Sequence, residues 1–258
     1  RQHQEIKEKF FRNVPPKDWP AVTIQLPVYN ERYVVKRLIQ SVCRFDYPRE
    51  LLEIQILDDS TDDTVDIAKA VAGEMTRQGF DIGYIHRDDR IGFKAGALKE
   101  GLKYAKGELV GIFDADFIPN PEFLKETVPY FRDPRIGMLQ TRWGHINSDY
   151  SLLTRAQSMG IDGHFGVEQA ARAWCGLFMN FNGTAGIWRK KTIEDAGGWQ
   201  ADTLTEDLDL SYRAQLKGWK LKFVADVVCP AEVPVTINAF KSQQHRWTKG
   251  AVQTAKKL

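Results

Sequence analysis

Cysteine is scarce in this sequence: the 258 residues contain only Cys43, Cys175 and Cys229. Their number is odd and their spacing is wide, so the sequence suggests neither a disulfide framework nor a zinc site. We therefore expect free or buried thiols, as in proteins of a reducing compartment.

Long hydrophobic runs are also missing. No stretch approaches the ~18 apolar residues that a membrane-spanning helix needs, and the polar start, residues 1–9, lacks the apolar core of a signal peptide. The chain begins within a helix-rich segment and ends on a basic segment without a capping signal. We therefore expect a fragment of a longer protein.

An excess of one charge sign is the third absence. The chain has 36 basic and 34 acidic residues, a formal charge of +2. This balance gives no reason to expect a nucleic-acid partner, although it permits a local basic patch for phosphate. What the chain does have is 43% hydrophobic residues, enough for a sizeable core in one large domain or two small ones.

Short apolar runs alternate with amphipathic helical segments in the first half of the chain. The expected strands are 21–26, 52–57, 82–86, 109–113 and 136–140, and the expected helices are 31–43, 64–78, 93–105 and 121–131. This rhythm predicts an α/β fold, a Rossmann-like, mostly parallel central sheet with helices on both faces. Ligands of such sheets bind beyond the carboxyl ends of the strands, near the topological switch point.

The second half is less regular. We expect helices at 151–173 and 206–217, a strand at 219–224, a glycine-bearing turn within 178–188 and an amphipathic segment at 236–257. The aromatic residues Trp174, Phe178 and Phe181 are interpreted as core, and the histidines His86, His145 and His164 as packing or surface residues.

Paired aspartates stand where two expected strands end. Asp58 and Asp59 close the second strand, and Asp114 and Asp116 follow the fourth. Oxygen donors spaced by one residue on a turn suit a hard divalent ion, which a bound diphosphate would help to coordinate. The alternative is that each aspartate is an ordinary turn or cap residue.

Three further clusters carry charge or aromatic groups. Arg90 and Lys94 flank a helix start that could hold a diphosphate; the alternative is a solvated basic turn. Thr205, Glu206 and Asp207 begin a helix. Either Thr205 is its N-cap and the acids oppose the helix dipole, or Asp207 is a general base. The segment 243–247, Gln-Gln-His-Arg-Trp, suits a sugar and a phosphate, or else a helix on a membrane surface.

Taken in order, these clusters resemble glycosyltransferase family two, in its processive branch of cellulose synthase-like enzymes. The resemblance is strongest to the plant-type β-mannan and glucan synthase-like subgroup, and it covers residues 22–247. Its motifs are Pro27-Val28-Tyr29-Asn30-Glu31, Asp58-Asp59-Ser60, Lys94-Ala95-Gly96, Asp114-Ala115-Asp116, Thr205-Glu206-Asp207 and Gln243-Gln244-His245-Arg246-Trp247, together with Phe181-Asn182-Gly183-Thr184-Ala185-Gly186 and Ala196-Gly197-Gly198-Trp199.

The resemblance implies a GT-A fold, a nucleotide-sugar donor and a divalent cation, Mg²⁺ or Mn²⁺. By position it implies a nucleotide-sugar site formed by Pro27, Tyr29, Glu31, Asp58, Asp59, Arg90, Lys94, Asp114, Gln243 and Arg246. It implies metal binding by Asp114 and Asp116, catalysis by Asp207, Glu206 and Asp116, and acceptor binding by Asn182, Gly183, Thr184 and Trp247.

The implied activity is inverting transfer of a hexose, from UDP-glucose or GDP-mannose, to the end of a growing β-glycan. The implied organisation is a juxtamembrane-like segment at 1–20, a catalytic domain at 21–235 and an interfacial segment at 236–258. Family members carry flanking transmembrane helices that this chain lacks, so the implied location is the cytoplasmic face of a membrane. Two other interpretations remain open: a non-processive transferase that makes a glycolipid, and a regulatory domain that binds a sugar nucleotide.

Overall fold

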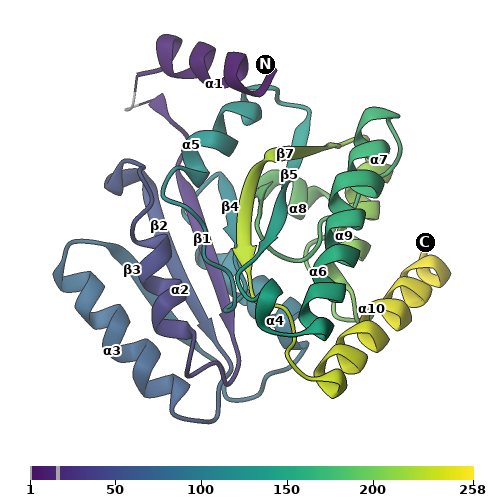
Figure 1. The fold of residues 1–258 in the computed structure, drawn as a ribbon. Helices are drawn as coiled ribbons and strands as arrows, with labels where there is room; N and C mark the ends of the chain where they lie inside the picture. Colours follow the sequence, from purple (N-terminus) through teal and green to yellow (C-terminus); the bar gives the residue numbers. More distant parts are fainter. Residues whose placement is uncertain (1, 16–17) are drawn as a thin grey trace.

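The computed structural model describes residues 2–15 and 18–258, and its centre is a seven-stranded sheet in the order β3-β2-β1-β4-β6-β5-β7 (Figure 1). The strands are β1 (Val22–Val28), β2 (Leu52–Asp58), β3 (Asp81–His86), β4 (Leu109–Ile112), β5 (Ile136–His145), β6 (Gly186–Arg189) and β7 (Lys220–Ala231). Only β6 pairs antiparallel with its neighbours in this sheet, β4 and β5. The expected mostly parallel sheet is confirmed.

Helices cover both faces of the sheet. They are α1 (Gln2–Asn13), α2 (Val35–Val42), α3 (Thr64–Arg77), α4 (Phe93–Tyr104), α5 (Phe123–Thr127), α6 (Leu152–Gly163), α7 (Ala170–Trp174), α8 (Lys190–Asp195), α9 (Glu206–Leu216) and α10 (Ile237–Lys257). Among the described residues, no helix is both long and apolar enough to span a bilayer.

The two faces of the sheet bury separate hydrophobic clusters. On one face, side chains of β1 such as Ile24 pack with Leu38 of α2 and with Ala68 of α3. On the other face, Val110 of β4 packs with Leu98 of α4 and with Leu210 of α9. The strands are buried on both faces, as in parallel sheets covered by helices. The polar residues that alternate with apolar ones in β1 and β2 are buried as well, and Gln25 donates to Gln55 at 3.0 Å.

The N-terminal segment packs against the first of these clusters. Phe10 of α1 is buried in it, and Trp19 packs beside Phe10 with ring centroids 6.1 Å apart. The aromatic contacts join α1 to the catalytic fold, whereas the division of the chain at residues 20 and 235 stays a prediction.

Several elements differ from the sequence-based expectation. The helix expected at 121–131 is instead a short α5 followed by a 3₁₀ turn, Val128–Arg132, because Pro129 has no N–H to donate to an α-helical ladder. The helix expected at 151–173 is interrupted by a π-helical segment, His164–Gln169. Strand β6 was not expected, and β7 continues seven residues past the predicted end, Val224, to Ala231.

The interpretation of Trp174 as a core residue is wrong. Its side chain is 82% exposed, and Phe178 is 39% exposed, whereas Phe181 is fully buried. The cause is geometric: α7 buries only Ala170 against the sheet, so Trp174, at the last position of this short helix, points away from it.

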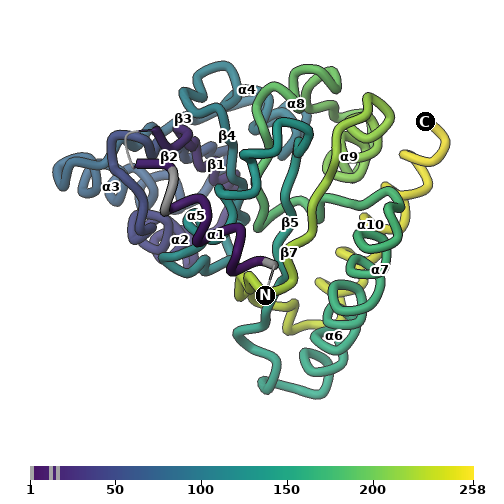
Figure 2. The backbone as a smooth tube through the Cα atoms, turned by 90° about the horizontal axis from the view of Figure 1, so that it is seen from above, coloured from purple at the N-terminus to yellow at the C-terminus, as the bar shows by residue number. Residues whose placement is uncertain are grey.

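Helices α6, α7 and α10 lie along one side of the molecule (Figure 2). Helix α10 begins at the cap Thr236 and passes the start of α9 very closely. A Cβ atom placed on Gly250 would lie 2.5 Å from the Thr205 side chain, so only glycine permits this approach. Lys257 fixes the end of α10 through ion pairs with Asp202 and Asp209, at 2.8 and 3.0 Å.

Candidate active site

The topological switch point lies between β1 and β4. From β1 the chain adds β2 and β3 on one side, then returns to place β4 on the other side of β1. Tyr29 and Glu31 follow β1, and Asp114 and Asp116 follow β4. Both predicted clusters therefore stand at the edge where such sheets bind ligands, while Pro27 belongs to β1 itself, paired in register with Leu57.

Asp58 and Asp59, at the end of β2, are both buried and both have protein partners. The carboxylate of Asp58 accepts hydrogen bonds from the Tyr84 hydroxyl at 2.5 Å and from the Ser60 backbone N–H at 2.9 Å. Asp59 forms a bidentate ion pair with Arg87, at 2.8 and 2.5 Å. Asp58 thus anchors the strand end, and contact of either carboxylate with a nucleotide stays a prediction.

The loop between β3 and α4 is held in a strained conformation beside β1. Arg90 and Phe93 have positive φ angles of 46° and 50°, which is costly for residues with a Cβ. Arg87 stabilises the loop by donating to the carbonyl oxygens of Ile91 and Phe93, at 2.9 and 3.0 Å. The Arg90 guanidinium lies 3.2 Å from the Tyr29 ring centroid, so Arg90 is not a free, solvated charge.

Lys94 joins the two halves of the chain. Its ammonium contacts the carboxylate of Asp114 and donates to the carbonyl oxygen of Gly183 at 3.0 Å. Burial favours the neutral amine, but the charges of Asp114, Glu206 and Asp207 outweigh it and raise the pKa of Lys94. The cation therefore stays charged among carboxylates from two distant segments, the turn after β4 and the start of α9.

The segment 182–184 forms the floor of this pocket. The Asp114 backbone N–H donates to the Thr184 hydroxyl at 2.9 Å. Thr184, which was predicted to bind the acceptor glycan, therefore also supports the acidic turn after β4. Gly183 has φ +85°, and a Cβ atom there would lie 3.0 Å from the Asp207 carboxylate. Asp114 and Asp207 are distant in sequence, but both lie next to the contact between Lys94 and Gly183.

The carboxyl groups of this pocket are hard to ionise. Burial and the neighbouring Asp114 raise the pKa of Asp116 to about 7, and burial followed by Asp114 raises the pKa of Glu31. Burial and then Glu206 raise the pKa of Asp207 to about 7, and burial raises the pKa of Glu206. Perturbed carboxylates clustered in a cleft are typical of catalytic sites.

Asp207 stands in the first turn of α9. Its carboxylate accepts from the Leu208 backbone N–H at 2.8 Å. The expected capping role of Thr205 is wrong in part: Thr205 occupies the N-cap position, but its side chain makes no capping hydrogen bond and faces Thr254 of α10 at 3.5 Å. The hydroxyl is directed to the close crossing of α9 and α10.

The residues present suit a divalent cation on the turn after β4. Asp114 and Asp116 are hard oxygen donors spaced by one residue, and burial followed by the charge of nearby Asp114 raises the pKa of Asp116. Within residues 2–15 and 18–258, no three His, Cys, Asp or Glu side chains are grouped so that they could hold a metal ion together. Two protein carboxylates with a diphosphate match the sparse protein coordination typical of Mg²⁺.

The turn that carries Asp116 depends on the end of β7. The Ile118 N–H donates to the Pro230 carbonyl at 2.9 Å, and the Glu232 N–H approaches the Asp116 carbonyl at 3.4 Å. Phe117 also forms an isolated bridge with Ala231. The predicted metal turn is therefore fixed by a strand that begins about a hundred residues later in the chain.

A cavity of about 520 Å³ opens on Asp207 from the side of α6 and α10. Predicted residues Asn182, Gln243 and Trp247 line it together with Asp207. The Trp247 and Trp143 rings lie 6.4 Å apart. Arg246 is near enough to Glu206 for its charge to oppose the rise in the Glu206 pKa. The segment 243–247 thus covers the proposed base instead of lying apart on the surface.

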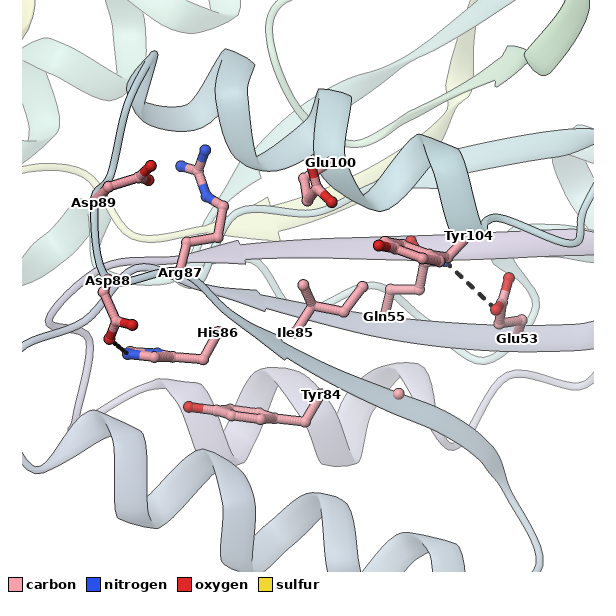
Figure 3. A pocket seen from close by; sticks show the side chains of 11 residues that line it. Glu53, Gln55, Tyr84, Ile85, His86, Arg87, Asp88, Asp89, Glu100 and Tyr104 are labelled. Carbon is pink, nitrogen blue, oxygen red and sulfur yellow. Dashed lines mark hydrogen bonds and ion pairs between the residues drawn. The ribbon is translucent and has the colours of Figure 1, made fainter.

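A second, open cavity of about 800 Å³ lies on the outer side of β3 (Figure 3). Ile85 of β3 and Arg87 just after it lie on the same side of the strand as Glu100 and Tyr104 of α4, whereas Tyr84 and His86 lie on its other side. None of the predicted site residues lines this cavity. Its wall includes Arg87, which links it to Asp59 only through the ion pair described above.

Sequence reasoning missed the residues that hold the predicted ones in place. Arg87, Tyr84, Gln140 and Trp143 belong to no motif that was singled out. Gln140, for example, accepts a hydrogen bond from the Asn182 N–H at 2.8 Å and is fully buried within β5. A polar residue within the apolar run 136–140 was the one available signal, because a buried amide needs a partner.

Comparisons with known proteins agree with this geometry. Residues 20–250 match the family described as "Glycosyltransferase like family 2". Glucomannan 4-beta-mannosyltransferase 2 of Arabidopsis thaliana is 46% identical over 246 residues, which are 93% of this chain and 46% of that protein. Glucomannan 4-beta-mannosyltransferase 1 of Cyamopsis tetragonoloba is 43% identical over 258 residues, 98% of this chain and 48% of that protein. The chain thus spans about half the length of these relatives.

Two solved structures share the fold. The mannosyltransferase PcManGT from Pyrobaculum calidifontis, solved with GDP-Man and Mn²⁺, superposes with a TM-score of 0.77 at 24% identity, covering 99% of this chain and 72% of that one. TarS of S. aureus, solved with UDP-GlcNAc, gives 0.64 at 18% identity, covering 84% of this chain and 59% of that one. The family match and the plant relatives together establish that the chain belongs to glycosyltransferase family 2, with the GT-A fold.

Proposed function

We propose that this chain is the catalytic domain of an inverting β-mannosyltransferase that uses GDP-mannose and a divalent cation to extend a β-linked glycan. The observation that carries the proposal is the contact of Lys94 with Asp114 and Gly183, because it joins the acidic turn after β4 to the pocket of Asp207. The names of the plant relatives favour mannose, and the ligand of PcManGT favours a guanosine donor.

In the proposed reaction, an acceptor hydroxyl oxygen attacks the anomeric carbon while the bond from that carbon to the diphosphate breaks. The bonding electrons leave with GDP, and the hydroxyl proton passes to the carboxylate of Asp207. Attack opposite to the leaving group inverts the anomeric configuration. The transition state resembles an oxocarbenium ion, so charge develops on both the ring and the departing diphosphate.

Positive side chains oppose the charge on the leaving group. Lys94 stands beside Asp114, and Arg246 approaches from α10 over Glu206. Asp114 and Asp116 would hold the divalent cation, which, when bound, supplies further positive charge to the diphosphate. Preorganised charges of this kind provide much of the rate enhancement in such sites.

The other interpretations have less support. A domain that only binds a sugar nucleotide does not need a carboxylate of raised pKa such as Asp207 on the far side of the pocket. A transferase of single sugars to lipid does not need the cavity of about 520 Å³ to continue from Asp207 past the two tryptophans, Trp143 and Trp247. A cavity lined by aromatic side chains beside Asp207 suits an oligosaccharide end.

A donor panel tests the proposal. The purified chain is incubated with Mn²⁺ or Mg²⁺ and with GDP-mannose, GDP-glucose, UDP-glucose or UDP-GlcNAc, with or without β-1,4-linked mannotetraose. Release of nucleoside diphosphate and mass spectrometry of the oligosaccharide are measured. We expect addition of mannose from GDP-mannose that EDTA abolishes. Efficient transfer from a uridine donor instead, or release that ignores EDTA, would contradict the proposal.

A further inference from the structure

One wall of the cavity that contains Asp207 is built by the π-helical segment His164–Gln169. Such segments are rare and occur mostly at functional sites. The wider turn separates two polar side chains, His164 and Gln169, that both contact Asn182 of the predicted acceptor segment. Histidine 164 belongs to no family motif considered above.

The orientation of these groups follows from one backbone carbonyl. The Gln169 Nε2 amide donates to the carbonyl oxygen of Asn180 at 2.8 Å, and a carbonyl can only accept. The same nitrogen lies 2.8 Å from Asn182, so the atom that faces it must be Oδ1. The Nδ2 amino group of Asn182 therefore points in the other direction, toward His164.

This arrangement also fixes the tautomer of His164. The Asn182 Nδ2 lies 2.9 Å from His164 Nε2 and must donate, so Nε2 carries a lone pair and no proton. The ring proton is on Nδ1, which donates to the Glu168 carboxylate at 2.9 Å. Arg172 holds the same carboxylate at 2.9 Å. Although burial opposes it, the contacts of His164 and Arg172 lower the pKa of Glu168.

The result is an asparagine amide held on both sides. Among the described residues, the Asn182 side chain keeps one N–H and one carbonyl lone pair without a protein partner. A donor and an acceptor in one plane match two adjacent hydroxyls of a pyranose, since each hydroxyl can donate and accept. The same cavity presents the Trp143 ring, which suits the apolar face of a sugar.

We propose that His164 is a positioning residue that holds the Asn182 amide in the orientation required to bind the terminal sugar of the acceptor. The inference rests on the proposed function, because it assigns this wall of the cavity to the acceptor. His164 does not touch the reacting atoms; it acts through Asn182, with Glu168 keeping its Nδ1–H in place.

The test separates acceptor binding from donor binding. Dissociation constants are measured by calorimetry for β-1,4-linked mannotetraose and, separately, for GDP with Mn²⁺. His164→Leu is expected to weaken mannotetraose binding by tenfold or more, the size of a lost, well-placed hydrogen bond network, and to leave GDP binding unchanged. His164→Gln, whose amide oxygen can accept from Asn182, is expected to recover most of the affinity.

His145→Leu is the matched control. His145 also pairs with a carboxylate, Asp162 of α6 at 3.0 Å, but it does not line the cavity. We expect its binding constants to equal those of the unchanged chain, and thermal melting verifies that each variant is folded. The proposal is overturned if His164→Leu binds mannotetraose normally, if it loses GDP as well, or if His164→Gln is no better than His164→Leu.

The outcome also distinguishes this inference from the proposed function. If the unchanged chain binds mannotetraose but transfers no mannose, the proposed function fails while the positioning role of His164 stands. If the chain transfers mannose to mannotetraose with the same KM in His164→Leu, the positioning role fails and the proposed function stands.

Discussion

The first half of the chain, residues 18–135, and the second half, residues 136–258, contribute to the pocket in different ways. In the first half, Tyr29, Asp59 and Asp114 each follow one of the mutually parallel strands β1, β2 and β4, so the sheet itself aligns them along one edge. In the second half, the functional residues lie on helix starts, a glycine turn and a π-helical wall. Alignment there depends on individual side-chain contacts.

This difference predicts how sensitive each half is to substitution. A parallel sheet tolerates side-chain substitutions because many backbone hydrogen bonds together hold its strands in place. The close approach of Gly250 to Thr205 is a single contact, and no other contact replaces it. It also predicts that damage around Asn182 and Asp207 in the second half changes transfer while nucleotide binding survives, and that damage to the first half changes both.

The largest expected effect concerns Asp207. Asp207→Asn removes the proposed proton acceptor and keeps the shape of the side chain, so transfer should fall on the order of 10²–10⁴-fold. Binding of GDP with Mn²⁺ should stay within about twofold, because Asp207 is not among the predicted nucleotide-binding or metal-binding residues. Stopped assays of GDP release and calorimetry measure the two quantities; near-normal turnover would refute the assignment of the base.

Asp116→Asn should lower both the rate of transfer and the affinity for GDP with Mn²⁺. The substitution removes one of two proposed metal carboxylates, so affinity for GDP with Mn²⁺ should fall about 10²-fold, as for other buried charged contacts. Transfer should fall at least as much. The matched control is Asp88→Asn, since the Asp88 side chain is fully exposed. Affinity that is unchanged and insensitive to EDTA would contradict the metal assignment.

Gly250→Ala should loosen the second half alone. The new Cβ would lie 2.5 Å from the Thr205 side chain, so α10 must move away from α9. Overpacking of this kind costs about 1–3 kcal/mol, and displacement of the segment 243–247 should lower transfer about tenfold. Gly163→Ala is the control, because nothing lies within 4 Å of that position. Equal melting temperatures and rates in both variants would show that the close crossing has no role.

The smallest effect is a dependence of stability on pH. Asp116 and Asp207 have pKa values of about 7 in the folded chain against 3.8 for a free aspartate. Between these values the folded state binds more protons than the unfolded state, so their contribution to stability falls as pH rises. We expect the melting temperature to fall by a few degrees from pH 5 to pH 8, and less so in Asp207→Asn. An identical pH slope in that variant would contradict the raised pKa.

The same contrast explains what could be predicted from the sequence. Strands β1, β2 and β4 lie within two residues of the predicted ranges, because short segments rich in Val, Ile and Leu between helical patterns are a local signal. Strand β6 was not predicted because it has only four residues and follows a glycine-bearing turn. The π-helical segment was not predicted because its side chains His164 and Gln169 form hydrogen bonds with Asn182, which lies outside the segment.

The site shows a similar division. Motifs identified the acidic residues and Lys94, and the structure places Asp114, Lys94 and Asp207 around one glycine. Motifs did not identify the residues that support the site, such as Arg87 for Asp59 or Gln140 for Asn182, because these pairs join positions 28 and 42 residues apart. Pairing over such separations is set by the sheet order, which a single sequence does not reveal.

The dependence of the Asp116 turn on the end of β7 has a consequence for the order of assembly. During synthesis, every residue of the predicted nucleotide motifs from Tyr29 to Asp116 leaves the ribosome before Pro230 and Glu232, which hold that turn. A nascent chain that stops before residue 220 therefore lacks the strand that completes its cation-binding turn. Nucleotide binding should emerge late and abruptly as the chain lengthens, although its own residues are synthesised first.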